Sequence, residues 1–173
     1  LRGRKLLLVA IMAWTDVFGD CTLQWFATSS RKSFGKRRKG LLMKVFISWS
    51  GERSRILAQA LHGWLPLVLH YVKPWLSDAD VSAGDRWATV VAKELETSNF
   101  GIICVTPENL NSPWVLFEAG ALAKAMQGSK VIPLLFNLEF SDISGPLAQF
   151  QAKKFDRDGA AEVVTSINKS ADS

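Results

Sequence analysis

The sequence is poor in the residues that build disulfide frameworks, metal centres and glycine-rich phosphate loops. Its 173 residues include only two cysteines and two histidines. Cys21 and Cys104 have no CxxC or Cys/His ligand spacing, so we expect neither a disulfide framework nor a metal site. His62 and His70 lie on an apolar segment and are interpreted as structural or surface residues. The sequence also contains no GxGxxG motif and no GxxxxGK[ST] motif, the two common glycine-rich nucleotide-binding patterns.

No apolar run in the sequence is long enough to span a membrane. Residues 1–14, LRGRKLLLVAIMAW, have the charged start and apolar core of a signal peptide, but the run is short and no A-x-A cleavage pattern follows. Met43 opens a fresh segment, MKVFISWS, which suits the start of a compact domain. We therefore expect residues 1–42 to be a basic leader, either disordered or a start-site or cloning artefact. The protein is predicted to be cytoplasmic, with no membrane partner.

The positive net charge of +5 belongs to this leader and not to the rest of the chain. Residues 1–42 contain nine Lys and Arg against two Asp, whereas residues 43–173 contain 12 basic and 14 acidic residues. A short basic cluster can contact nucleic acid, but a solvated tail is the preferred interpretation, so no specific nucleic-acid partner is expected. The apolar fraction of 48% is typical of a globular protein. Residues 43–173 are long enough to form one domain with a full core.

Strand and helix patterns alternate along residues 43–173. Short apolar runs without polar alternation predict strands, and amphipathic segments between them predict helices. Such strands indicate a parallel sheet covered by helices on both faces, an α/β fold with about five strands. Pro66 is expected to end or kink the first helix. The predicted strands are 45–49, 72–77, 100–106, 130–136 and a short fifth within 151–156; the predicted helices are 52–65, one capped by Asp85, one starting at Ser112, and 159–169.

Three polar loops follow the first three predicted strands. They are SWSGERS (48–54), SDADVSAGD (77–85) and TPENLNS (106–112). Ligands of open parallel sheets bind beyond the carboxyl ends of the strands. The three loops are therefore expected to surround one crevice.

The segment 112–125, SPWVLFEAGALAKA, predicts a helix with one carboxylate on its apolar face. Ser112 can cap free N–H groups, and Pro113 suits the first helical position. Glu118 lies one turn after Trp114 in the apolar stripe. A buried, unpaired charge is unfavourable, so Glu118 must be paired, neutralised or placed at the edge of a cleft. A structural carboxylate and a functional one both remain open from this segment alone.

Taken together, these segments resemble a Toll/interleukin-1 receptor (TIR) domain, in particular the NAD⁺-cleaving TIR domains of bacterial defence. KVFISWS is similar to the first strand and its loop, SDADVSAGDRW to the second strand end and BB loop, and SPWVLFEAGAL to the helix with the WxxxE pattern, here Trp114 to Glu118. The resemblance covers about Met43 to Lys169 and implies a flavodoxin-like fold. One departure is Ser82-Ala83-Gly84, where many receptor TIR domains have a proline before the glycine.

The resemblance implies an NAD⁺ glycohydrolase with Glu118 as its catalytic residue. The products would be nicotinamide and ADP-ribose or a cyclic isomer. NAD⁺ would be the substrate, so no cofactor is expected. The family also implies self-association through the BB loop. Two sources of activation stay open: a separate sensor or effector protein, or a further part of a longer chain.

The other site residues are weaker candidates, each with a structural alternative. Ser48, Ser50 and Arg53 could reach the phosphates of NAD⁺, although ordinary helix capping is the alternative for Ser50. Gly84 would serve the geometry of the BB loop. Either ligand contact or core packing could explain Trp87 and Trp114. Two other functions stay open: a non-catalytic TIR interaction module, and a flavodoxin-like nucleotide binder suggested by the SWSGERS loop.

Overall fold

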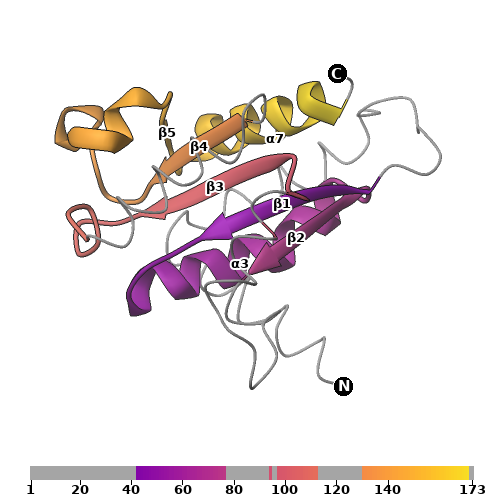
Figure 1. The fold of residues 1–173 in the computed structure, drawn as a ribbon, viewed down its shortest axis with the longest axis horizontal. Coiled ribbons are helices and arrows are strands. Elements are labelled where there is room, and N and C mark those ends of the chain that lie inside the picture. The colour runs from indigo at the N-terminus through magenta and orange to yellow at the C-terminus, as the bar shows by residue number, and fades with distance from the viewer. Residues whose placement is uncertain (1–41, 77–93, 95–96, 113–129, 172–173) are drawn as a thin grey trace.

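The computed structural model describes residues 42–76, 94, 97–112 and 130–171, and its centre is a five-stranded parallel sheet. The strands are β1 (Met43–Ser48), β2 (Val72–Leu76), β3 (Phe100–Val105), β4 (Lys130–Leu135) and β5 (Lys153–Lys154). Their order across the sheet is β2-β1-β3-β4-β5, as Figure 1 shows. The predicted α/β fold with about five parallel strands is confirmed. Within the described ranges, no helix is both long and apolar enough to cross a membrane.

One face of the sheet is covered by the helices α3 (Glu52–Val68) and α7 (Arg157–Ala171), and Figure 1 shows them against the strands. Because successive side chains of a strand point to opposite faces, Val45 and Ile47 of β1 lie on this face. They belong to one apolar cluster with Leu61 of α3 and Val163 of α7. The helices therefore share a continuous core beneath the sheet.

The opposite face carries a second apolar cluster, which includes Phe46, Ile103 and Leu135. Phe46 stacks on Trp75 of the edge strand β2, with ring centroids 5.1 Å apart. Leu147, from the short 3₁₀ helix η2 (Gly145–Gln149), is fully buried in this cluster. A second 3₁₀ helix, η1 (Phe140–Asp142), precedes it. Burial on both faces explains why the strand sequences lack polar alternation.

Pro66 does not end the first helix as one of the two expectations had it, because α3 continues through Pro66 to Val68. A proline inside a helix removes one backbone hydrogen bond, but here it lies in the last turn, where little helix remains to be disrupted. The Leu69 N–H closes the helix by donating to the Leu65 carbonyl, at 2.8 Å. The Pro66 carbonyl lies 3.1 Å from His70 Nδ1. These two contacts give hydrogen-bonding partners to the Leu65 and Pro66 carbonyls at the end of the helix.

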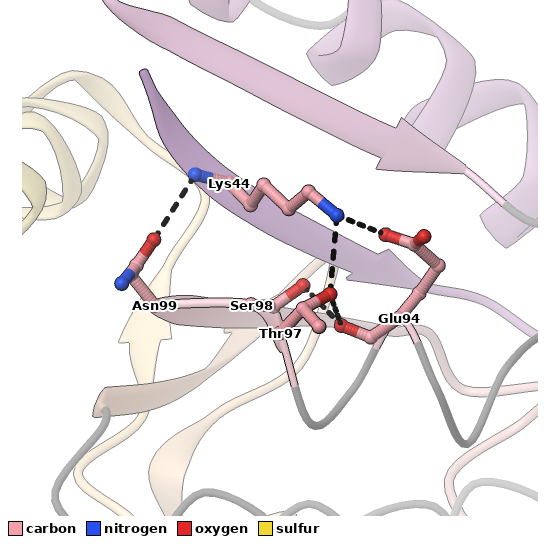
Figure 2. Close-up of polar contacts among 5 residues, drawn as sticks. All are labelled: Lys44, Glu94, Thr97, Ser98 and Asn99. Atoms are coloured by element: carbon pink, nitrogen blue, oxygen red, sulfur yellow. Dashed lines mark hydrogen bonds and ion pairs between the residues drawn. The ribbon is translucent and has the colours of Figure 1, made fainter. Parts of the chain in front are cut away.

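A polar network fixes the start of β3 against β1 at the amino ends of the strands (Figure 2). The Lys44 N–H donates to Asn99 Oδ1 at 3.3 Å, and the Asn99 N–H donates to the Lys44 carbonyl at 3.1 Å. The Lys44 ammonium group donates to Glu94 Oε2 at 3.0 Å and to Thr97 Oγ1 at 3.1 Å. The Ser98 hydroxyl donates to the Glu94 carbonyl at 2.7 Å. Since this network is at the end of the sheet opposite the predicted crevice, we assign it a structural role.

The last helix, α7, starts in close contact with the end of β5. Asp156 Oδ1 accepts a hydrogen bond from the Gly159 N–H at 2.8 Å, the pattern of an N-cap residue. A Cβ atom added at Gly159 would lie only 1.9 Å from the backbone carbonyl oxygen of Lys154. That space is too small for any other residue.

We expect Gly159→Ala to lower the free energy of unfolding by about 1–3 kcal/mol, the usual effect of forcing extra volume into a packed region. Gly63→Ala is the matched control, because nothing lies within 4 Å of a Cβ added at Gly63 on α3. Alanine also favours a helix over glycine, so this control should gain about 0.5–1 kcal/mol. Urea unfolding of both variants measures the difference. Equal midpoints would contradict the tight packing at Gly159.

Candidate functional site

Two loops far apart in the sequence meet at the carboxyl ends of β1 and β3, and Figure 1 shows both leaving the same end of the sheet. The hydroxyl groups of Ser50 and Ser112 lie 3.2 Å apart in a hydrogen bond. Asn109 Nδ2 donates to the Ser50 carbonyl at 3.0 Å. In the order β2-β1-β3-β4-β5 the direction of the connections reverses between β1 and β3. That switch point is where open α/β sheets bind their ligands.

Asn109 holds the loop after β3 in shape. Its side chain is buried, and its Oδ1 accepts a hydrogen bond from the Thr106 N–H at 2.8 Å. Its Nδ2 donates to the carbonyl of Cys104 at 3.0 Å as well as to that of Ser50. The Asn109 N–H donates in turn to the Thr106 carbonyl at 3.1 Å. One amide therefore closes a turn after β3 and joins that turn to the loop after β1.

The start of α3 is closed by Ser54 and not by Ser50. Ser54 Oγ accepts from the Ser50 N–H at 2.9 Å and donates to the Ser50 carbonyl at 2.7 Å. The helix follows Gly51, whose φ of 86° lies in the left-handed region that glycine adopts most easily. No side chain caps α3 at Gly51. The alternative role of Ser50 as a helix cap is therefore wrong, and its hydroxyl faces Ser112 instead.

An exposed ion pair joins the first turn of α3 to the loop after β3. Arg53 Nη1 lies 2.7 Å from Glu108 Oε1, and the two side chains are 49% and 56% exposed. The hydrogen bond from Arg53 is the main reason that the pKa of Glu108 falls to about 2. Hydrogen bonds from the backbone of Glu108 and from the Thr106 side chain lower this pKa further. The Glu108 carboxyl group is therefore ionised throughout the physiological pH range.

We expect a carboxyl-carbon NMR titration to place the pKa of Glu108 at about 2 and to show its rise toward the ordinary 4.5 in Arg53→Gln. A carboxyl group with a lowered folded-state pKa stabilises the protein above its unfolded-state pKa, and this contribution disappears as the pH falls toward 2. Arg55→Gln is the control, because Arg55 on the same helix pairs with Glu52. A Glu108 pKa that is unchanged in Arg53→Gln would contradict the assigned cause.

The structure places three of the predicted site residues near the switch point. Ser50 lies in the loop after β1 and Arg53 in the first turn of α3, whereas Ser48 is the last residue of β1 and only 2% exposed. A phosphate could reach the Ser48 hydroxyl only after a local rearrangement. Gly84, Trp87, Trp114 and Glu118 lie outside the described residues, and so does the loop 77–85. Their roles stay predictions.

Sequence reasoning did not identify Asn109 or Glu108. The spacing Thr106-x-x-Asn109 was a usable signal, because an asparagine side chain often accepts a hydrogen bond from nearby backbone N–H groups in turns. No sequence signal could have matched Glu108 with Arg53, which lies 55 residues earlier in the chain. Asn109 binds the Ser50 carbonyl in the loop after β1, and Glu108 binds Arg53 at the start of α3.

Comparisons with known proteins agree with this fold. The family model described as "TIR domain" matches residues 45–166. No curated protein sequence matches the chain significantly. One similar solved structure is a metazoan TIR-STING receptor from C. gigas in complex with 2′,3′-cGAMP, with a TM-score of 0.57 and 16% identity over 79% of this chain. This chain spans 42% of that receptor.

A second similar structure is the TIR domains of the activated Roq1 resistosome, which directly recognizes the pathogen effector XopQ. It has a TM-score of 0.52 and 18% identity over 75% of this chain and 84% of the other. Identities this low show the fold alone, whereas the family model covers most of the residues from β1 to α7. The chain therefore belongs to the TIR domain family.

Proposed function

We propose that this TIR domain cleaves NAD⁺ at the bond between nicotinamide and ribose, giving nicotinamide and ADP-ribose or a cyclic isomer. The observation that carries the proposal is the junction of the loops after β1 and β3 at the switch point of the sheet. Ser112 lies in that junction and is six residues before Glu118. A helix that starts at Ser112, as the sequence predicts, would place Glu118 about 9 Å along its axis, within reach of a dinucleotide in the crevice.

A single carboxylate suits this reaction. When the bond between ribose C1′ and the pyridinium nitrogen breaks, its electron pair stays on the nitrogen and nicotinamide leaves neutral. Positive charge develops on the ribose, and the Glu118 carboxylate would stabilise it, as carboxylates do in glycoside hydrolysis. Water then adds to C1′ and loses a proton, or an internal nucleophile gives the cyclic product. The departing group needs no acid catalyst, so a second carboxylate is not required.

The biological setting belongs to the same proposal. The resemblance to bacterial defence-type TIR domains favours a role in cytoplasmic anti-phage defence or signalling. The similarity to the TIR domains of an activated resistosome supports self-association as part of activation. We propose that the BB loop mediates this contact and that a separate sensor or effector protein starts it.

We expect nicotinamide release per molecule of protein to rise with protein concentration. A site completed by a neighbouring copy forms only in the assembly, so mass action controls its population. Chromatographic measurement of nicotinamide after incubation with NAD⁺, at dilute and concentrated protein, tests both the reaction and the assembly. Ala83→Glu, which adds a charge to the predicted BB loop, should lower the activity of the concentrated protein and leave the dilute protein unchanged.

The possible outcomes separate the candidate functions. Specific activity that is constant with protein concentration would contradict the proposed assembly, but it would still be consistent with NAD⁺ cleavage. Absence of nicotinamide release at every concentration would overturn the enzymatic proposal in favour of the interaction module.

A further inference from the structure

We infer that Glu108 is a specificity-determining residue that holds Arg53 until an anionic ligand takes its place. The inference rests on the proposed function for the identity of the ligand, a nucleoside diphosphate group such as that of NAD⁺. When this group binds beside the pair, the Arg53 guanidinium leaves the Glu108 carboxylate and pairs with the phosphate oxygens. Glu108 thereby competes with the substrate for the Arg53 guanidinium. It sets how strongly an anion must bind in order to displace it.

The position of the pair supports this exchange. Arg53 lies in the first turn of α3, immediately after the loop that Asn109 and Ser112 join to the end of β3. Glu108 lies on the opposite side of the same junction. Within the two described segments 49–54 and 106–112, the one cationic residue is Arg53. An anion beside these two segments therefore meets a guanidinium that is already paired with a carboxylate.

The exposure of the pair makes the exchange feasible. Both side chains are about half exposed, and pairs of this kind contribute little because water screens them. The guanidinium binds carboxylate and phosphate oxygens in the same planar, forked geometry. A diphosphate carries more negative charge than one carboxylate, so it can displace Glu108 without moving the α3 backbone.

A double-mutant cycle with ADP as the probe tests the inference. We expect isothermal titration calorimetry to show ADP binding about two- to fivefold more tightly to Glu108→Gln, the range given by the loss of one exposed pair. Arg53→Gln should weaken binding by about tenfold, because a charge-assisted hydrogen bond to phosphate is lost. In the Arg53→Gln background, Glu108→Gln should have no effect, because the carboxylate no longer has a cation to hold.

Glu52→Gln is the matched control. It removes one carboxylate from the same helical turn, and this carboxylate pairs with Arg55 at 2.7 Å. Glu52→Gln changes the net charge by the same amount as Glu108→Gln. It should nevertheless leave the affinity for ADP equal to that of the parent protein. Adenosine, which lacks the diphosphate, should bind equally to the parent protein and to Glu108→Gln.

NMR of the Glu108 carboxyl carbon gives a readout that does not depend on catalysis. Saturating ADP should raise the pKa of Glu108 from about 2 toward its ordinary value, because Arg53 has left it. The inference is overturned if the parent protein does not bind ADP or if ADP leaves this titration unchanged. The inference is also overturned if Glu108→Gln strengthens ADP binding equally in the parent protein and in Arg53→Gln. That result would indicate that Glu108 repels anions in general and does not act through Arg53. Nicotinamide release is measured separately, so ADP-driven exchange without cleavage would overturn only the proposed enzyme activity.

Discussion

Glu118→Gln should lower the rate of nicotinamide release by about 10²- to 10³-fold, the usual effect of removing one well-placed electrostatic group. The substitution keeps the volume of the side chain and removes its negative charge. If Glu118 stabilises a developing cation, its interaction is stronger in the transition state than with bound NAD⁺, so kcat should fall much more than binding. The melting temperature should stay near that of the parent, because an amide is easier to bury than a carboxylate.

The structural explanation of Glu118 predicts the opposite pattern. If Glu118 is half of a buried ion pair, its replacement strands the partner and destabilises the fold by about 3–5 kcal/mol. Melting temperature and nicotinamide release measured on the same preparation separate the two explanations. Glu162→Gln is the control, because Glu162 lies on α7 and pairs with Lys153. A stable Glu118→Gln variant that cleaves NAD⁺ at the parent rate would falsify the catalytic assignment.

Asn109→Leu is expected to destabilise the domain by roughly 2–4 kcal/mol, because buried polar groups lose their partner. The Thr106 N–H loses its acceptor, and the carbonyls of Cys104 and Ser50 each lose a donor. The two loops at the switch point would also lose the hydrogen bond that joins them through Asn109. Chemical unfolding measures the effect. A midpoint equal to that of the parent would contradict a structural role for the buried amide.

Asn109→Asp adds a pH dependence to the same test. The carboxylate keeps the acceptor for Thr106 but turns a second oxygen toward two carbonyl oxygens that were 3.0 Å from the amide nitrogen. Burial and this repulsion should raise the folded-state pKa of the new carboxyl group above its unfolded-state value. Stability relative to the parent should therefore be lowest above the folded-state pKa and recover as the pH falls below it. Asn111→Asp, at an exposed position in the same loop, should show neither effect.

The sequence determined the order of the strands and of the two long helices that the structure describes, but not the 3₁₀ helices η1 and η2. Apolar runs such as FGIICV cannot expose either face to water, so they specify a sheet covered on both sides. Even the two-residue strand β5 lies within the predicted segment 151–156. Such elements follow from local periodicity, which needs no knowledge of distant contacts. The end of the first helix was predicted too early, at residue 65 and not at Val68. A helix tolerates a proline in its last turn, because little helix follows that the proline could disrupt.

The tertiary structure decided which polar side chains meet. Ser50 and Ser112 are 62 residues apart, and Arg53 and Glu108 are 55 apart, yet both pairs are in hydrogen-bond contact. In the sequence these residues are ordinary loop polar groups with several local partners available. Only the parallel pairing of β1 with β3 brings their loops to one edge of the sheet. Partner choice among polar groups depends on distance and desolvation, and the folded sheet sets both.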